Sequence, residues 1–229
     1  MQLMPTIPSN SFSLETAKYL LDIKAVNFRP NEPYRLTAGW ASPVYIDCRW
    51  LISFIEARRR IIELSCHMIK QDIDVDQIDM IAGGETAGIP YAAWISESLS
   101  KPMLYIRKKP KGFGRDSQIE GSLGKKNQVL LIEDLSTDGG SKINFVNALR
   151  NAGADVTDIF VIFFYAAFPN SSNLLEELGV KLHYLANWHD ILQVAEKGKY
   201  FSNQAIADVK EFLMDPVSWS AANGGKGPE

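Results

Sequence analysis

The sequence predicts an α/β fold: a mostly parallel sheet flanked by helices, with a small N-terminal hood. Short apolar runs suited to buried strands recur along the chain, and segments with helical periodicity separate them. Parallel strands need such crossovers, because a tight hairpin can join only antiparallel strands. The chain has 229 residues, 46% hydrophobic and 22% charged, which is typical of one large globular domain.

Five apolar runs are expected to form the strands of the sheet. They are IDMIAG from Ile78, MLYIR from Met103, QVLLIE from Gln128, DIFVIFFYA from Asp158 and KLHYLA from Lys181. Residues 53–70, 86–100 and 140–151 have helical patterns, and Gly153 follows the last of these, as is typical of a helix end. Because the runs are largely apolar, helices are expected on both faces of the sheet.

A different region precedes the sheet and forms the predicted hood. A helix is expected over residues 14–25, followed by YRLTAGWASPVYIDCRW, in which two β-prone runs flank a turn of small residues. Helices near residues 188–196 and 203–214 close the domain. The expected organisation is an N-terminal helix and hood (1–50), a core (51–214) and a flexible tail (215–229).

Charge and cysteine content narrow the class of protein. The net charge of −3 and isoelectric point near 5.7 argue against binding nucleic acid through overall basicity. Cys48 and Cys66 are too few for a disulfide framework and are not spaced as metal ligands. The sequence shows no run long enough for a membrane span, and MQLMPTIPSN does not resemble a signal peptide. A cytoplasmic protein that binds neither nucleic acid nor membrane is expected.

The stretch VLLIEDLSTDGGS, from Val129 to Ser141, carries the strongest chemical signal. A buried strand runs into two carboxylates, Glu133 and Asp134, and then into a loop of hydroxyls and glycines that leads to a helix. Ligands of open parallel sheets bind beyond the carboxyl ends of the strands. The loop and the helix N-terminus suit a phosphate monoester. The acids would repel that phosphate, so they require a metal cation or a neutral polyol, and a sugar phosphate supplies the polyol.

A basic segment, RKKPKGFGRDSQIEG from Arg107 to Gly121, is the second signal. Five basic residues lie within nine positions, among glycines, which indicates a mobile lid at residues 107–119. Such a lid would bring cations to a diphosphate, whose negative charge increases as it leaves. A solvated charged turn and a nucleic-acid-binding patch are the alternative interpretations.

Both segments resemble a known family. VLLIEDLSTDGGS is similar to the phosphoribosyl-diphosphate (PRPP) motif of type I phosphoribosyltransferases. The basic segment, ETAGIPYAA at Glu85 and RLTAGWASPVYID at Arg35 resemble the orotate phosphoribosyltransferase family, and the matches span residues 34–141 in the family's order. The resemblance implies the type I phosphoribosyltransferase fold.

The resemblance also implies an activity, a cofactor and an assembly. The expected reaction transfers 5-phosphoribosyl from PRPP to orotate and gives orotidine 5′-monophosphate and diphosphate, in de novo pyrimidine biosynthesis. Mg²⁺ is the expected cofactor and would arrive on PRPP. A homodimer is expected, in which the basic loop reaches into the partner subunit's site.

Individual residues receive roles from the same resemblance. Lys111 and Asp134 are the expected catalytic residues, with Lys111 neutralising the leaving diphosphate. Tyr45 and Thr137 are expected to contact orotate, and Glu133 and Asp134 to contact Mg²⁺ weakly or through water. The expected PRPP-binding residues are Arg107, Lys108, Lys111, Glu133, Asp134, Ser136, Thr137, Asp138, Gly139, Gly140 and Ser141.

Some positions depart from the family pattern. Thr37 and Ala166 stand where some members have a lysine and an arginine near orotate. Backbone N–H groups around residues 37–42 are an alternative partner for orotate's carboxylate. Two other functions stay open: a phosphoribosyltransferase for another nucleobase, and a PRPP-sensing regulator that binds nucleic acid through the basic segment.

Overall fold

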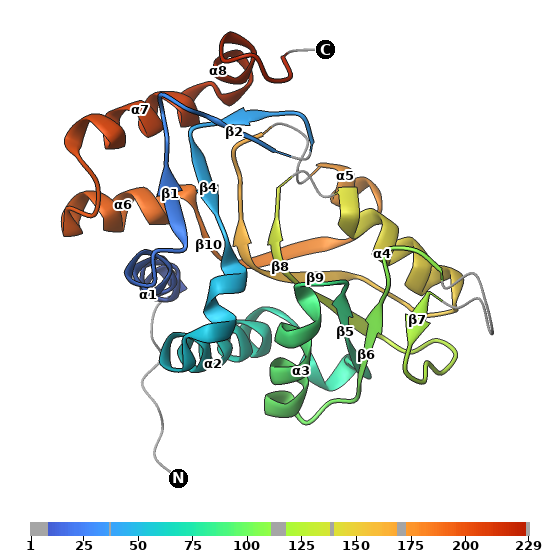
Figure 1. Ribbon diagram of the computed structural model, residues 1–229. Coiled ribbons are helices and arrows are strands. Elements are labelled where there is room, and N and C mark those ends of the chain that lie inside the picture. Colours follow the sequence, from blue (N-terminus) through green and yellow to red (C-terminus); the bar gives the residue numbers. More distant parts are fainter. Residues whose placement is uncertain (1–8, 37, 111–117, 138–139, 169–172, 228–229) are drawn as a thin grey trace. The chain divides into compact units, whose positions relative to one another are not determined.

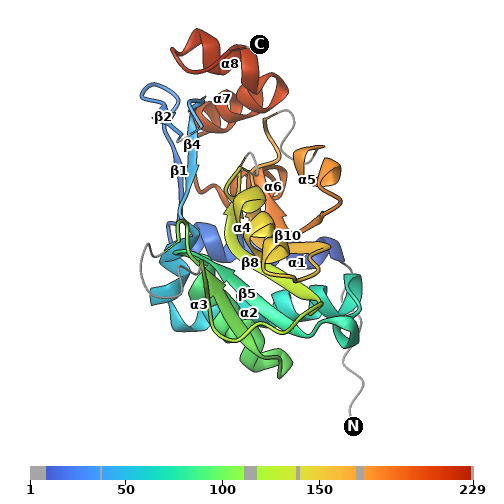
Figure 2. The same ribbon diagram turned by 90° about the vertical axis from the view of Figure 1, so that its right-hand side faces the viewer.

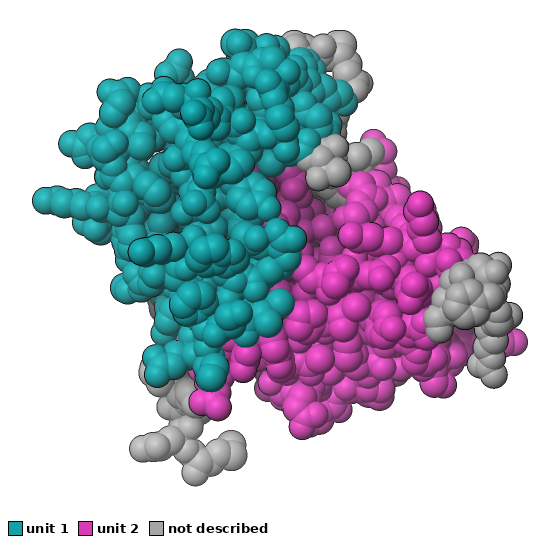
Figure 3. Space-filling view, viewed as in Figure 1, with its two compact units in different colours: residues 1–57, 185–229 teal, residues 58–184 magenta. Residues whose placement is uncertain are grey.

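The computed structural model describes residues 9–36, 38–110, 118–137, 140–168 and 173–227. The chain divides into two compact units, residues 1–57 with 185–229, and residues 58–184 (Figure 3). The expected core of 51–214 is therefore split between the two units. The reason is that the C-terminal helices cluster with the N-terminal segment rather than with the strands that precede them.

The sheet is the expected one. Its six strands follow the order β10-β9-β8-β5-β6-β7 (Figure 1). The strands are β5 (Met80–Gly84), β6 (Met103–Ile106), β7 (Ile119–Glu120), β8 (Val129–Ser136), β9 (Asp158–Phe164) and β10 (Lys181–Asn187). β5 pairs in parallel with β6 and β8, and β8 with β9, whereas β6 and β7 are antiparallel. All five expected strands are confirmed, and β7 is an addition.

Helices cover both faces of this sheet, which explains the apolar strands. They are α2 (Ile55–Asp72), α3 (Gly88–Leu99), α4 (Gly140–Asn151) and the short α5 (Asn173–Glu177), with the 3₁₀ turn η2 (Val75–Gln77). Met80 and Ala82 of β5 join the core beneath α4 with Phe145. Gly83, the next residue after Ala82 on the strand, faces α3, where an added Cβ would lie 3.0 Å from the Ala92 Cβ. The two helices therefore lie on opposite faces (Figure 2).

The other unit combines the two ends of the chain. Its elements are α1 (Ser9–Asp22), β1 (Val26–Phe28), β2 (Tyr34–Arg35), β3 (Ala41–Ser42), β4 (Val44–Ile46), η1 (Cys48–Ser53), α6 (Trp188–Gly198), α7 (Asn203–Met214) and α8 (Pro216–Ala222). β1 pairs with β4 and β2 with β3, both antiparallel. Phe28 stacks on Phe201, with ring centroids 4.0 Å apart. Among the described residues, no helix is long and apolar enough to cross a membrane.

The C-terminal segment forms a helix, α8, although the sequence predicts a flexible tail there. Asp215 caps α8 by accepting a hydrogen bond from the Ser218 N–H at 3.0 Å, and Pro216 occupies the first helical turn, where its missing N–H costs nothing. Ser220 Oγ accepts a hydrogen bond from the Ala41 N–H at 2.9 Å. A glycine at position 225 allows the close approach of this segment, because a Cβ at Gly225 would collide with Ala41.

A capping box begins α6 and yields a stability prediction. The Asn187 side chain accepts hydrogen bonds from the N–H groups of His189 (2.8 Å) and Asp190 (3.3 Å), and Asp190 accepts one from the Asn187 N–H. Asn187→Ala should therefore lower the free energy of unfolding by about 1 kcal/mol. Urea denaturation would measure it, with exposed Gln193→Ala on the same helix as control. Equal losses in both variants would contradict the assigned cap.

Candidate active site

The acidic stretch lies where a buried strand becomes a helix. β8 runs to Ser136 and α4 begins at Gly140. Glu133 and Asp134 therefore belong to the last residues of a strand that lies between β5 and β9. The carboxyl ends of β5, β6 and β8 meet at one edge of the sheet, since these strands are parallel. Thr137 and Ser141 flank the loop at the same edge, whereas Asp138 and Gly139 lie outside the described residues.

The Glu133 carboxylate is buried in a space made by two glycines. A Cβ added to Gly84 or to Gly88 would collide with Glu133 Oε1. Its other oxygen, Oε2, lies 3.2 Å from the Lys142 ammonium, and the two side chains are only 8% and 7% exposed. Burial raises the pKa of Glu133 to about 7, although the Lys142 ammonium acts in the opposite direction. The neighbouring Asp134 is also buried.

Three buried polar atoms at this edge lack a partner. Within the part of the chain that the structure describes, Glu133 Oε1, Ser136 Oγ and Arg107 Nε are buried and have no hydrogen-bond partner. Buried polar atoms of this kind are normally satisfied, so three in one predicted site call for an external group. A carboxylate oxygen needs a donor such as a sugar hydroxyl, and a guanidinium N–H needs an acceptor such as a phosphate oxygen.

The base of the basic segment is held at the same edge. The Arg107 N–H donates to the Gln118 carbonyl and the Gln118 side chain donates to the Arg107 carbonyl, each at 2.8 Å, so β6 and β7 are bridged there. The Lys108 N–H donates to Glu85 Oε2 at 2.7 Å, and its carbonyl accepts from the Asn144 side chain at 3.2 Å. The Lys108 backbone is thus joined to the β5–α3 loop and to α4, and the Arg107 backbone to Gln118. Lys111 lies outside the described residues.

The expected orotate-binding residues belong to the other unit, apart from Thr137. Tyr45 lies on β4, where its ring stacks against Tyr34 with centroids 5.0 Å apart and its hydroxyl accepts from Arg49 at 3.3 Å. The expectation that N–H groups of residues 37–42 bind a carboxylate is wrong for Gly39 and Ala41. Their N–H groups already donate to the Leu36 carbonyl and to Ser220 Oγ.

Sequence reasoning missed two contributors to the candidate site, Glu85 and Lys142. Lys142 did carry a signal, because a lysine in the first turn of a helix is disfavoured by the helix dipole unless an acid lies nearby. Glu85 sits in the ETAGIPYAA stretch, but its contact with the Lys108 backbone depends on the pairing of β5 with β6 and could not be read locally.

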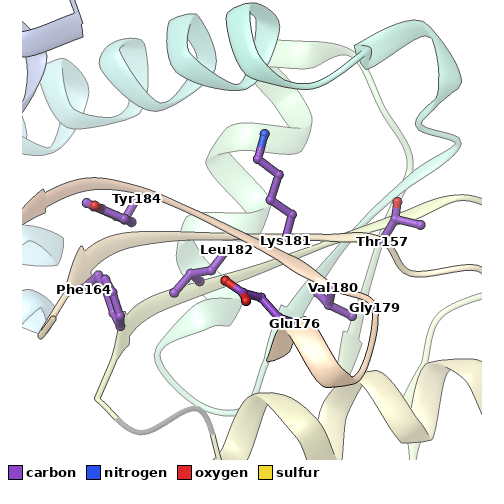
Figure 4. A pocket seen from close by; sticks show the side chains of 8 residues that line it. All are labelled: Thr157, Phe164, Glu176, Gly179, Val180, Lys181, Leu182 and Tyr184. Carbon is purple, nitrogen blue, oxygen red and sulfur yellow. The ribbon is translucent and has the colours of Figure 1, made fainter. Parts of the chain in front are cut away.

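Glu133 and Asp134 are the candidate metal ligands at this edge. Among the described residues, no group of three or more His, Cys, Asp or Glu side chains could hold a metal ion. Glu133 and Asp134 supply hard oxygen ligands that suit Mg²⁺, which would take its other ligands from substrate or water. A separate cavity of about 660 Å³ is lined by Thr157 and by residues of β9, β10 and the segment between them (Figure 4). None of the predicted site residues lines it.

Comparison with known proteins agrees with this geometry. No family model matches the sequence. The chain is 46% identical over 225 residues to the orotate phosphoribosyltransferase of Sinorhizobium fredii, covering 96% of this chain and 97% of that protein. Among solved structures, it resembles UMP synthase of Leishmania donovani (TM-score 0.75, 29% identity, 88% of this chain and 42% of that chain). It also resembles orotate phosphoribosyltransferase from Aeropyrum pernix (TM-score 0.67, 28% identity, 80% and 99%). The chain belongs to the orotate phosphoribosyltransferase family.

Proposed function

We propose that this protein transfers the 5-phosphoribosyl group of PRPP to orotate, with orotidine 5′-monophosphate and diphosphate as products. The observation that carries this proposal is the 46% identity to an orotate phosphoribosyltransferase over almost the whole of both chains. The structure supports it with paired acids, a hydroxyl-rich loop and a helix N-terminus at one edge of the sheet.

The ribose phosphate is the part of PRPP that suits the end of β8. Glu133 and Asp134 would accept hydrogen bonds from the two vicinal hydroxyls, and the unpartnered Glu133 Oε1 is suited to one of them. The 5-phosphate would meet the loop and the N-terminus of α4, which favour an anion. The residues proposed for this part are Ser136, Thr137, Asp138, Gly139, Gly140 and Ser141.

The diphosphate is the proposed partner of the basic segment. As the bond to the sugar breaks, positive charge develops on the ribosyl group and negative charge on the leaving diphosphate. Arg107 and Lys108 are anchored at the sheet edge by their backbones, and the unpartnered Arg107 Nε can donate to a diphosphate oxygen. Lys111 is proposed to neutralise the leaving group, and the Asp134 carboxylate to stabilise the positive sugar.

Orotate, magnesium and assembly complete the proposal. Tyr45 would stack on the pyrimidine ring, and Thr137 would contact it from the phosphate loop. Glu133 and Asp134 would hold Mg²⁺ weakly or through water, and the ion would neutralise charge on the diphosphate. We further propose a cytoplasmic homodimer, with the basic loop acting on the partner subunit's site, that serves de novo pyrimidine synthesis without binding nucleic acid or membrane.

Loss of orotate's ultraviolet absorbance on mixing the protein with PRPP and Mg²⁺ would test the activity. We expect rapid loss that EDTA abolishes and that Lys111→Ala slows by about 100- to 1,000-fold, because one stabiliser of the leaving group is gone. Lys125→Ala, at an exposed lysine, is the control. Turnover of another nucleobase instead of orotate, or salt-sensitive RNA binding without turnover, would overturn the substrate assignment.

The glycines around Glu133 provide a second prediction. Gly84→Ala should push the Glu133 carboxylate and the Phe145 ring out of place, since both contact the added methyl group. The KM for PRPP should rise by about tenfold, a loss of about 1.4 kcal/mol in binding, while the KM for orotate stays unchanged. Gly124→Ala is the matched control, because its methyl group meets the end of the Asn127 side chain, which can move. Similar KM values for PRPP in both variants would refute the placement of Glu133.

A further inference from the structure

Lys142 is a buried cation that the proposed reaction has not used. It lies in the first turn of α4, where the helix dipole disfavours a positive charge, and its side chain is only 7% exposed. A buried ammonium is stable only with hydrogen-bonding partners of suitable charge. Lys142 has two: its Nζ lies 3.2 Å from Glu133 Oε2 and donates to Ser141 Oγ at 3.2 Å.

These two partners belong to different parts of the proposed PRPP site. Glu133 is one of the acids proposed for the ribose hydroxyls, and Ser141 belongs to the loop proposed for the 5-phosphate. An ammonium can only donate hydrogen bonds, so both partners must act as acceptors toward it. This leaves the Ser141 hydroxyl hydrogen to donate elsewhere, as a phosphate oxygen requires. It also leaves Glu133 Oε1 to accept elsewhere, as a ribose hydroxyl requires.

We propose that Lys142 is a positioning residue for PRPP, which fixes the orientation of the Glu133 carboxylate and of the Ser141 hydroxyl without touching the ligand. The inference rests on the proposed PRPP site and deepens it. Removal of the ammonium leaves the Glu133 carboxylate free to rotate away from its place beside Gly84 and Gly88. PRPP binding should weaken, whereas orotate binding should not change.

A merely structural role makes a different prediction. If Lys142 only balanced a buried charge, its loss would reduce stability, because a buried charge would be left unpaired. The smaller folded fraction would then lower the maximal rate but leave the KM for PRPP and the KM for orotate unchanged. The two roles are therefore distinguished by comparing the KM for PRPP with the KM for orotate, and by the PRPP affinity of the folded protein.

The experiment compares Lys142→Met, Glu133→Gln and the double variant with the wild type. Calorimetric titration with PRPP and Mg²⁺ gives the Kd without any need for orotate turnover. We expect Lys142→Met to raise the Kd and the KM for PRPP by about tenfold or more, with the KM for orotate within about twofold of wild type. In the Glu133→Gln background, Lys142→Met should have a smaller effect than in the wild type, because only the Ser141 hydroxyl is then still positioned by Lys142.

The double variant and Lys125→Met control for misfolding and for a general charge effect. The double variant removes both buried charges, so it leaves no unpaired charge to prevent folding, and its PRPP affinity is compared with that of Glu133→Gln alone. Lys125→Met makes the same charge change at an exposed lysine and should leave the PRPP affinity unchanged.

Each outcome decides the question. An unchanged PRPP affinity in Lys142→Met, equal rises in both KM values, or additive losses in the double variant would overturn the positioning role. Failure of the wild type to bind PRPP would overturn the proposed function together with this inference. Normal PRPP binding without orotate turnover would overturn only the choice of base and would leave the test of Lys142 valid.

Discussion

The ion pair between the Glu133 carboxylate and the Lys142 ammonium determines how the side chains at the end of β8 are arranged. Two buried charges need each other, and they also need space and further partners. Gly84 and Gly88 supply the space, because any side chain there would meet the carboxylate. The first turn of α4 supplies the cation. Three segments that are separate in the sequence are thus arranged around one ion pair.

Coverage of the sheet on both faces explains why this polar cluster lies at an edge. Six of the eight residues of β8 lie in an unbroken buried run, since α3 and α4 occupy the opposite faces. Polar side chains therefore gather where the parallel strands end. The Lys108 backbone is held there by Glu85 and Asn144, which come from the loop after β5 and from α4. The geometry follows from parallel pairing rather than from any single motif.

Local patterns were sufficient to predict the strands of the sheet and the position of the acids. Continuous short apolar runs are typical of strands that are buried on both faces. The chain direction then defines the carboxyl end of each strand. Features that depend on distant partners were missed. β7 is two residues long and exists because it pairs with β6, and α8 was expected to be a flexible tail. The N–H groups of Gly39 and Ala41 were expected to be available to orotate's carboxylate. The Leu36 carbonyl and Ser220 Oγ already accept their hydrogen bonds.

The hydrogen bond between Ala41 and Ser220 joins residues 179 positions apart, and Lys226 donates to the Gly39 carbonyl beyond it. During synthesis, the unit of residues 58–184 is complete in the nascent chain while the unit that contains both chain ends still lacks its second half. The Ala41 N–H and the Gly39 carbonyl lack these partners until residues 220–226 have left the ribosome. The order of translation therefore separates the assembly of the two units in time, and the contiguous unit can fold first.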